Sequence, residues 1–384
     1  MSAPGVSVEL LKVRDFRAYR AAEIRLGEGL TVIFGPNGAG KTNLLEALYF
    51  GCTGRSCRTN DERQVVRFGA QAARVEVRTR DRDGVHELSV GFQPGEPKRL
   101  RVDGAPVDRL VDSPARPLVS VFLPERLDLV KGGPSGRRSH LDQVVAALWP
   151  SRAPTRKAYA NALAQRNALI ARIRKGAGSR SSLPAWDREL ARQGVALRAD
   201  RAEAVAALQE PFAAAAADLG LAGTVGLEER PRDRPLDEEG FFAQLAEKLD
   251  ADLERGFTLH GPHRDDLALL RAPATSAADD GRLPLRELRS FGSQGEQRMG
   301  LLALLLAERE VLAEARGGAP LLLLDDVMSE LDVVRRERLV ERVRGTGGQA
   351  VVTTTDLAHV PGADGADVAR VEVREGAVVV QEDA

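Results

Sequence analysis

Residues 35–42 read Gly35-Pro36-Asn37-Gly38-Ala39-Gly40-Lys41-Thr42, a glycine followed by four residues and then Gly-Lys-Thr. The stretch before them, residues 30–34, is apolar and β-branched, which predicts a buried strand. The stretch after them, residues 43–49, favours a helix with one apolar face. A strand, a glycine loop and a helix in this order predict a phosphate-binding loop (P-loop), rather than a glycine turn that merely joins two elements.

The predicted P-loop suits a nucleoside triphosphate. Glycines let backbone N–H groups converge on phosphate oxygens, and the helix N-terminus adds its partial positive charge. We expect Lys41 to reach the β- and γ-phosphates of ATP, and the hydroxyl of Thr42 to bind Mg²⁺. All of residues 35–42 are therefore candidate nucleotide contacts, and Lys41 is also a candidate catalytic residue.

The composition predicts a globular protein of two domains, or of one domain with a large insertion. The chain has 384 residues, of which 43% are hydrophobic and 29% are charged. The net charge is −1, so any contact with nucleic acid must come from a local basic patch. Cys52 and Cys57 are the two cysteines, which fits a reducing compartment. With no signal segment and no long apolar run, we expect a cytoplasmic protein without a membrane span.

The sequence around the P-loop predicts short strands. Residues 6–34 alternate between apolar and polar types, and residues 73–104 give several strands separated by Asp83-Gly84 and Asp103-Gly104 turns. The second stretch therefore predicts an antiparallel β-meander, after which residues 118–122 return as an apolar strand. Residues 12–17 form a cationic and aromatic cluster, which is either a solvated turn or a wall of the nucleotide-base pocket.

From about Arg137 to Glu254, alanine, arginine and leucine replace the β-branched residues. This change predicts an all-helical insertion with two long antiparallel helices around a flexible, basic break at residues 176–182. The insertion has no sustained heptad repeat, so it does not predict a long coiled coil. Strand character returns at residues 256–269, and residues 272–283 are expected to form a mobile loop.

Residues 320–326 are expected to complete the site. Four leucines predict a central strand, at whose C-terminal edge Asp325 and Asp326 follow. Asp325 is placed to hold Mg²⁺ directly or through water, and Asp326 to orient or deprotonate the attacking water. Both are candidate catalytic residues, and Thr42 and Asp325 are the candidate metal ligands. The alternative for each aspartate is a solvated acid at the end of a strand.

A further anion site is expected at Ser293 and Gly295, where a long apolar helix begins. Its place ahead of Asp325 matches the signature segment of ABC-type ATPases, whose serine contacts the γ-phosphate bound by another subunit. Residues 330–332, Glu-Leu-Asp, take the place of the D-loop, and residues 353–356 that of the switch segment, without its histidine. This order predicts two copies that close head to tail on two ATP molecules and separate after hydrolysis.

Several motifs together make the sequence resemble the RecF family of DNA replication and repair ATPases. One family signature is matched by residues 124–138 with Leu141-Asp142, and the other by residues 323–332. Other motifs agree in kind and order, at residues 35–43, 54–59, 261–266 and 293–298. Cys57 stands where a histidine is usual, and His140 where an aromatic residue is usual.

The resemblance implies an α/β fold: an ABC-type ATPase head, with a mixed sheet, an antiparallel β subdomain and a P-loop, that carries an inserted α-helical second domain. The expected parts are residues 1–136 with the P-loop, 137–255 as the helical lobe, and 256–384 with the signature, the Walker B strand and the D-loop. It also implies ATP-dependent DNA binding with weak, DNA-stimulated hydrolysis. The implied partners are RecO and RecR at gapped DNA, in recombinase loading, replication-fork repair and the SOS response.

The residues themselves indicate less about DNA binding than the family resemblance does. Lys131, Arg137 and Arg138 follow the returning strand and are candidate phosphate contacts, with solvated surface charge as the alternative. Aromatic residues make up only 4% of the chain, so contact with the backbone of duplex DNA or of a junction fits better than stacking of single-stranded bases.

Other functions compete with an ATP-gated DNA clamp. An ABC subunit that powers a membrane transporter would need a helical region that docks on a membrane partner; the arginine- and alanine-rich insertion argues against it. An SMC-type chromosome protein would need long coiled arms, for which the chain has no room. A small-molecule phosphotransferase would leave the Ser293 segment and residues 330–332 unexplained.

Overall fold

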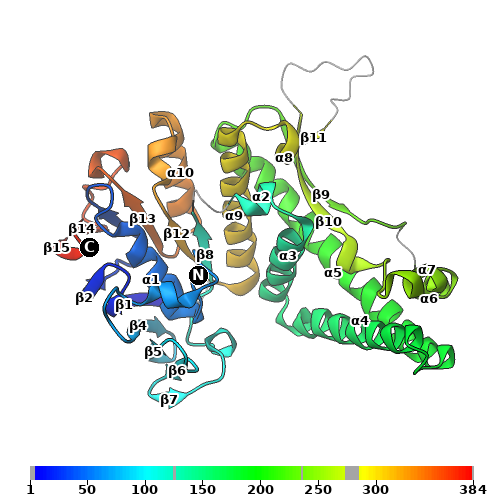
Figure 1. Cartoon of the computed structure of the whole chain (residues 1–384). Helices are drawn as coiled ribbons and strands as arrows, with labels where there is room; N and C mark the ends of the chain where they lie inside the picture. The colour runs from blue at the N-terminus through cyan, green and yellow to red at the C-terminus, as the bar shows by residue number, and fades with distance from the viewer. Residues whose placement is uncertain (1–4, 124–126, 235–236, 273–284, 383–384) are drawn as a thin grey trace. The chain divides into compact units, whose positions relative to one another are not determined.

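The computed structural model describes residues 5–123, 127–234, 237–272 and 285–382 (Figure 1). The described chain divides into two compact units. Unit 1 comprises residues 1–126, 217–220 and 302–384, and unit 2 comprises residues 127–216 and 221–301. Residues 124–126, which open one of the RecF-like signatures, and most of the expected mobile loop at 272–283 lie outside the described residues.

A mixed six-stranded sheet positions the P-loop in unit 1. Its strand order is β15-β14-β3-β13-β12-β8. Strands β14, β3, β13, β12 and β8 run parallel, and β15 closes an antiparallel hairpin at one edge. The bounds are β3 Leu30–Phe34, β8 Val119–Phe122, β12 Leu321–Leu324, β13 Ala350–Thr354, β14 Val368–Arg374 and β15 Ala377–Glu382. The apolar runs predicted to be strands at 30–34, 118–122 and 321–324 are therefore confirmed.

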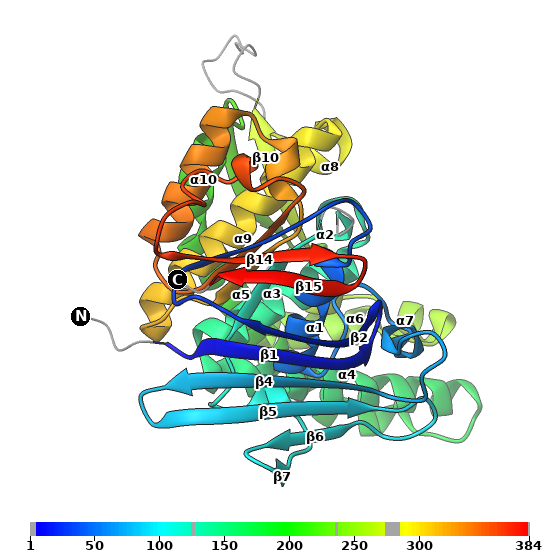
Figure 2. The same ribbon diagram turned by 90° about the vertical axis from the view of Figure 1, so that its left-hand side faces the viewer.

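A second sheet of unit 1 is antiparallel throughout, with strand order β2-β1-β4-β5-β6-β7. The strands are β1 Ser7–Phe16, β2 Tyr19–Arg25, β4 Ala73–Asp81, β5 Gly84–Phe92, β6 Arg99–Val102 and β7 Ala105–Pro106. This sheet contains the predicted β-meander. Helix α1 (Lys41–Thr53) shares one buried core with both sheets, so the helix that follows the P-loop is packed on two sides (Figure 2).

The rest of unit 1 is helical. Helix α9 (Gln294–Arg316) crosses the boundary between the units at residues 301 and 302, and α10 (Val333–Gly345) follows the short 3₁₀ turn Val327–Glu330. Arg309 of α9 is fully buried, and its guanidinium donates hydrogen bonds to the carbonyls of Pro320, Val343 and Gly347. These bonds tie α9 to the start of β12 and to the end of α10.

Unit 2 is mostly helical and contains a small antiparallel sheet. Its helices are α2 Asp128–Lys131, α3 Pro134–Leu148, α4 Ala153–Arg174, α5 Leu183–Asp218, α6 Glu238–Glu247, α7 Leu249–Arg255 and α8 Leu288–Phe291; the last two residues of α5 belong to unit 1. The sheet has the order β11-β10-β9, with β9 Thr224–Arg230, β10 Asp266–Ala272 and β11 Arg286–Glu287. The two long helices and the break between them are confirmed. The expectation of an all-helical stretch is wrong at β9, because Leu227 and its neighbours pair with β10, a strand some forty positions further along the chain.

A polar cluster lies in the core of unit 2. Arg166 of α4 is 0% exposed and donates to Asp187 of α5 and to Asp252 of α7, both at 2.6 Å. It also donates to the hydroxyl of Thr258 at 2.7 Å. The Arg166 guanidinium therefore joins α4 to α5, to α7 and to the segment before β10. Asp187 and Asp252 are each paired with this cation, as burial of a charge requires.

Candidate nucleotide-binding site

The P-loop leaves β3 in a conformation that only its glycines favour. Gly35, Gly38 and Gly40 have φ angles of +149°, +79° and +112°. A Cβ on Gly35 would lie 2.1 Å from the carbonyl oxygen of Val373 in β14. Two hydrogen bonds also hold the end of the loop. The hydroxyl of Tyr19 donates to the Gly40 carbonyl at 3.1 Å, and the N–H of Gly376 donates to the Ala39 carbonyl at 2.9 Å. The β14–β15 hairpin and β2 therefore hold the loop in shape.

Replacing Gly35 by alanine is expected to destabilise unit 1 by about 2–3 kcal/mol, because the new methyl group must displace the backbone of β14. Gly38→Ala is the matched control: Gly38 also has a positive φ, but nothing lies within 4 Å of the position that a Cβ would take there. It should cost only about 1 kcal/mol. Urea unfolding followed by circular dichroism measures both. Equal losses in the two variants would show that the close approach to Val373 is not a constraint.

The ammonium of Lys41 lies inside the loop. Lys41 is 8% exposed, and its Nζ donates to the carbonyls of Gly35 at 2.7 Å and Pro36 at 2.9 Å. Burial lowers the pKa of Lys41, while the charges of Asp326 and Asp325 oppose this shift. The cation is thus held where loop N–H groups and the start of α1 also favour anions.

Asp325 and Thr42 meet as the sequence predicts. Asp325 follows β12 and Thr42 stands at the start of α1, and β13 is the strand between β12 and β3. The Thr42 hydroxyl lies 2.9 Å from both carboxylate oxygens of Asp325, and Thr353 of β13 donates to Asp325 Oδ1 at 2.7 Å. Burial raises the pKa of Asp325, and the bonds from Thr353 and Thr42 oppose this. A hydroxyl and a carboxylate at one point are the hard oxygen donors that Mg²⁺ requires, so the residues fit this ion.

Asp326 lies beside this pair in a strained backbone conformation. Its φ is +47°, and its N–H donates to the Thr353 hydroxyl at 3.0 Å. Within the described part of the chain, the buried Oδ1 atom of Asp326 has no hydrogen-bond partner. A buried carboxylate oxygen without a donor is costly unless something else supplies one. The strain and the open acceptor both suit a residue that receives a hydrogen bond from a bound water.

One buried acid of this region is not predicted by the sequence analysis. Glu46 of α1 is 0% exposed, and Arg17 donates to both of its oxygens, at 2.8 and 2.7 Å. Ser56 donates to Glu46 at 2.5 Å, and Arg58 lies 3.7 Å away. A glutamate among leucines on the apolar face of a predicted helix was the available signal. The residues of the predicted cationic cluster at 12–17 therefore do not act together. Arg17 binds Glu46 of α1, whereas the side chains of Lys12 and Arg14 lie on the other face of the antiparallel sheet.

Ser293 and Gly295, the predicted signature residues, are exposed at the start of α9. The Ser293 N–H donates to Glu296 at 2.8 Å, and the Glu296 N–H donates back to the Ser293 hydroxyl at 3.3 Å, which is a capping box. Arg271 forms an ion pair with Glu296. The helix start is thus preformed and open to solvent. In unit 1, Asp332 of the D-loop segment caps α10 by accepting from the Arg335 N–H at 2.9 Å.

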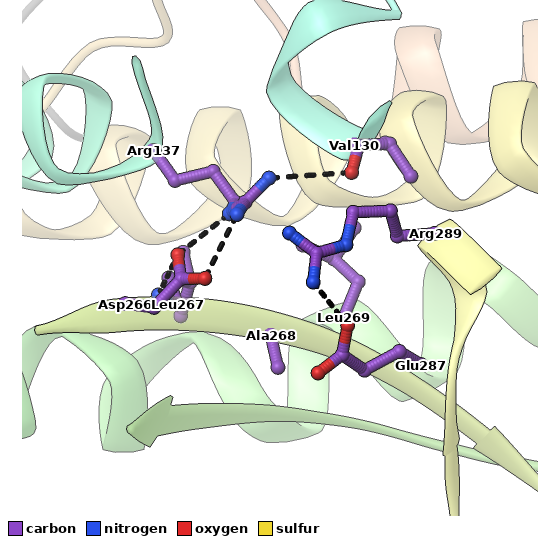
Figure 3. A pocket seen from close by; sticks show the side chains of 8 residues that line it. All are labelled: Val130, Arg137, Asp266, Leu267, Ala268, Leu269, Glu287 and Arg289. Carbon is purple, nitrogen blue, oxygen red and sulfur yellow. Dashed lines mark hydrogen bonds and ion pairs between the residues drawn. The ribbon is translucent and has the colours of Figure 1, made fainter. Parts of the chain in front are cut away.

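The three candidate DNA contacts differ in exposure. Lys131 is exposed, whereas Arg137 is only 2% exposed and donates to both carboxylate oxygens of Asp266 of β10, at 2.7 and 2.8 Å (Figure 3). Arg138 is half-buried and donates to the carbonyl of Asp265 at 2.7 Å. Arg137 thus has its guanidinium in a structural ion pair, which leaves it no free face for a phosphate.

The mixed, mainly parallel sheet, the P-loop and the acid at the end of a nearby strand define the head of an ABC-type ATPase. Residues 7–378 match the model of the RecF/RecN/SMC N terminal domain. The chain is 38% identical to the DNA replication and repair protein RecF of Streptomyces avermitilis over 92% of this chain and 94% of that one. It is 36% identical to RecF of Myxococcus xanthus over 97% of each. The chain belongs to the RecF family of DNA replication and repair proteins.

Solved structures agree with this assignment. The recombination mediator protein RecF in complex with ATP, from the RecFOR pathway, has a TM-score of 0.80 and 26% identity over 99% of both chains. The SMC head bound to the C-terminal winged-helix domain of ScpA is similar in fold alone, with a TM-score of 0.60, 17% identity, and coverage of 98% of this chain and 97% of that one.

The alternative of a transporter subunit is set aside, because the relatives are DNA replication and repair proteins. Across the described residues, no helix has the length and apolarity that a bilayer crossing needs.

Proposed function

We propose that this protein is an ATP-operated clamp of recombinational DNA repair. Two copies close head to tail on DNA when each binds ATP, and slow hydrolysis separates them. The observation that carries this proposal is the contact of Thr42 and Thr353 with Asp325, at 2.9 and 2.7 Å, which assembles the P-loop and the acidic strand end within one chain. The similarity to an ATP complex of RecF supports ATP as the nucleotide.

Each residue of the site has a distinct part in this proposal. The P-loop N–H groups and Lys41 bind the phosphates, for which Lys41 leaves the Gly35 and Pro36 carbonyls. Thr42 and Asp325 would hold Mg²⁺, and the ion would supply positive charge to the phosphates when bound. Asp326 accepts a hydrogen bond from the attacking water through its open Oδ1.

The second half of the site comes from the other copy in this proposal. Ser293 and Gly295 lie at an exposed helix start, where the backbone N–H groups favour an anion. We place it on the γ-phosphate held by the partner's P-loop. Residues 137–255 remain the proposed helical lobe, with β9 as its strand, and RecO and RecR are the proposed partners at gapped duplex DNA in the cytoplasm. The solved relative is a recombination mediator of the RecFOR pathway, which supports these partners.

Ser293→Arg tests the two-copy mechanism, since a long cation at the helix start blocks the closing of the second copy. We expect ATP-dependent dimerisation on duplex DNA to weaken at least about tenfold, with binding of ATP to the single chain unchanged. Mass photometry with a non-hydrolysable analogue measures the first, and fluorescent-nucleotide titration the second. Ser179→Arg is the matched control, because Ser179 is another exposed serine that caps a short helix. A Ser293→Arg chain that dimerises like the parent would refute the head-to-tail site.

A further inference from the structure

The antiparallel sheet of unit 1 has one buried face and one open face. In β4 the side chains alternate strictly: Ala73, Val75 and Val77 are buried, whereas Arg74 and Arg78 are exposed. The buried face packs on α1, where the Cβ that Gly51 lacks would touch Val75 and Val77. The open face, defined by the outward side chains of β1, β4, β5 and β6, looks toward the viewer in Figure 2. Its cations are Lys12, Arg14, Arg74, Arg78, Arg80, Arg99 and Arg101.

The strand register lines up three of these arginines in one row across the sheet. Arg14 of β1 is paired with Arg74 of β4, Arg74 with Gly91 of β5, and Gly91 with Arg99 of β6. Neighbouring strands lie about 4.8 Å apart. The side chains of Arg14 and Arg74 therefore leave the sheet from adjacent strands, and the side chain of Arg99 leaves it about 10 Å from that of Arg74. Gly91 places no side chain between them. Like charges opposite each other on neighbouring strands destabilise a sheet, so this row favours a bound anion.

Acidic side chains neutralise only part of the open face. Lys12 pairs with Glu23, Arg74 with Glu76, Arg80 with Glu9 and Arg99 with Glu96, and Glu87 also lies on this face. These pairs are at the surface, where an ion pair contributes little and exchanges readily.

Other cations of this region are not ion-paired within the described residues. Arg14, Arg78 and Arg101 form no ion pair there, although Glu87 lies opposite Arg78 in the strand register. An open hollow of about 530 Å³ at the end of the β1–β2 hairpin is lined by Arg14, Arg20, Asp15 and Ala21. The acid in it, Asp15, is bound by Arg67 at 2.8 Å. Two guanidiniums thus line a hollow wide enough for a phosphate group.

We infer that the open face of this sheet binds the sugar–phosphate backbone of duplex DNA, with Arg14, Arg74 and Arg99 as its central row. The inference rests on the proposed function and gives it a contact surface. Arginine forks match phosphate oxygens, and a row without base-reading geometry binds DNA of any sequence. The outward positions around the row, at residues 12, 76, 78, 89 and 101, carry no aromatic side chain on which a single-stranded base could stack. The face also supplies the local basic patch that a chain of net charge −1 requires.

The triple variant Arg14→Gln, Arg74→Gln, Arg99→Gln tests this surface. The dissociation constant for duplex DNA is measured between 50 and 200 mM salt, with a non-hydrolysable ATP analogue present. Each lost phosphate contact reduces the salt slope by about one, so the slope should fall by about three and binding at 100 mM salt should weaken at least about tenfold. ATP binding, which uses a different sheet, should not change.

Two control variants make the result specific. The triple lysine variant of the same positions keeps the charge, and should keep the salt slope to within about one. Arg188→Gln, Arg192→Gln, Arg338→Gln removes three exposed arginines elsewhere and should bind DNA like the parent. The proposed DNA-binding surface would be wrong if the triple glutamine variant kept the parent's salt slope. It would also be wrong if the distant control variant lost as much affinity for duplex DNA. Failure of the parent chain itself to bind duplex DNA would instead refute the proposed function. A loss of single-strand binding alone would also contradict the inference.

Discussion

Asp325→Asn is expected to lower the rate of ATP hydrolysis at least about 100-fold, the size of effect seen when one preorganised electrostatic group is removed from a site. The carboxylate of Asp325 is buried at the end of β12 and lies 2.9 Å from the Thr42 hydroxyl. An asparagine keeps the shape and one acceptor oxygen, but it removes the negative charge that holds a divalent cation. Single-turnover hydrolysis as a function of Mg²⁺ concentration measures the effect, and binding of ATP without Mg²⁺ should change little.

Substitutions of two other aspartates show whether a lower rate of ATP hydrolysis comes from the loss of Asp325 itself, from the loss of any acid of unit 1, or from a slower chemical step. Asp364 is an exposed acid in the loop between β13 and β14, and Asp364→Asn should hydrolyse ATP like the parent chain. Asp326→Asn should keep the Mg²⁺ dependence of ATP binding but slow the chemical step, if its open Oδ1 orients the water. An Asp325→Asn chain with parental turnover would show that the acid at the end of β12 is not part of the ATPase site.

Arg166→Met is expected to destabilise unit 2 by about 4 kcal/mol, because it leaves two buried carboxylates without their cation. Asp252 is fully buried and Asp187 is nearly so, and both receive their hydrogen bonds at 2.6 Å from the same guanidinium. Both tryptophans, Trp149 and Trp186, belong to unit 2. Urea unfolding followed by tryptophan fluorescence therefore reports on this unit.

The control for Arg166 lies on the same helix. Arg172 of α4 is exposed, so Arg172→Met should change the stability by less than about 0.5 kcal/mol. The double variant Arg166→Met, Asp187→Asn should recover part of the loss, since one of the two stranded charges is gone. If Arg166→Met unfolds at the parent's urea concentration, the buried cluster does not hold unit 2 together.

Local patterns predicted the elements around the nucleotide site well. A glycine loop between a β-branched run and a helix-forming run has few other structures open to it, and four leucines before two acids predict a central strand. The strict alternation in β4 equally indicates one apolar and one charged face. By contrast, β9 lies among helices and its partner strand begins at Asp266, so no short window of sequence contains the pairing.

By itself the sequence determined the class of the protein: the P-loop, the acidic strand end and the signature serine each occupy a short run whose chemistry is local. Only the tertiary structure decided what neighbouring charges do. Arg137 and Arg14 are both arginines near strands, yet Arg137 is buried on Asp266 and Arg14 is exposed in a row with Arg74. The reason is that burial and strand register are set by contacts between distant segments. Those contacts decide whether a cation stabilises the fold or remains open to a phosphate.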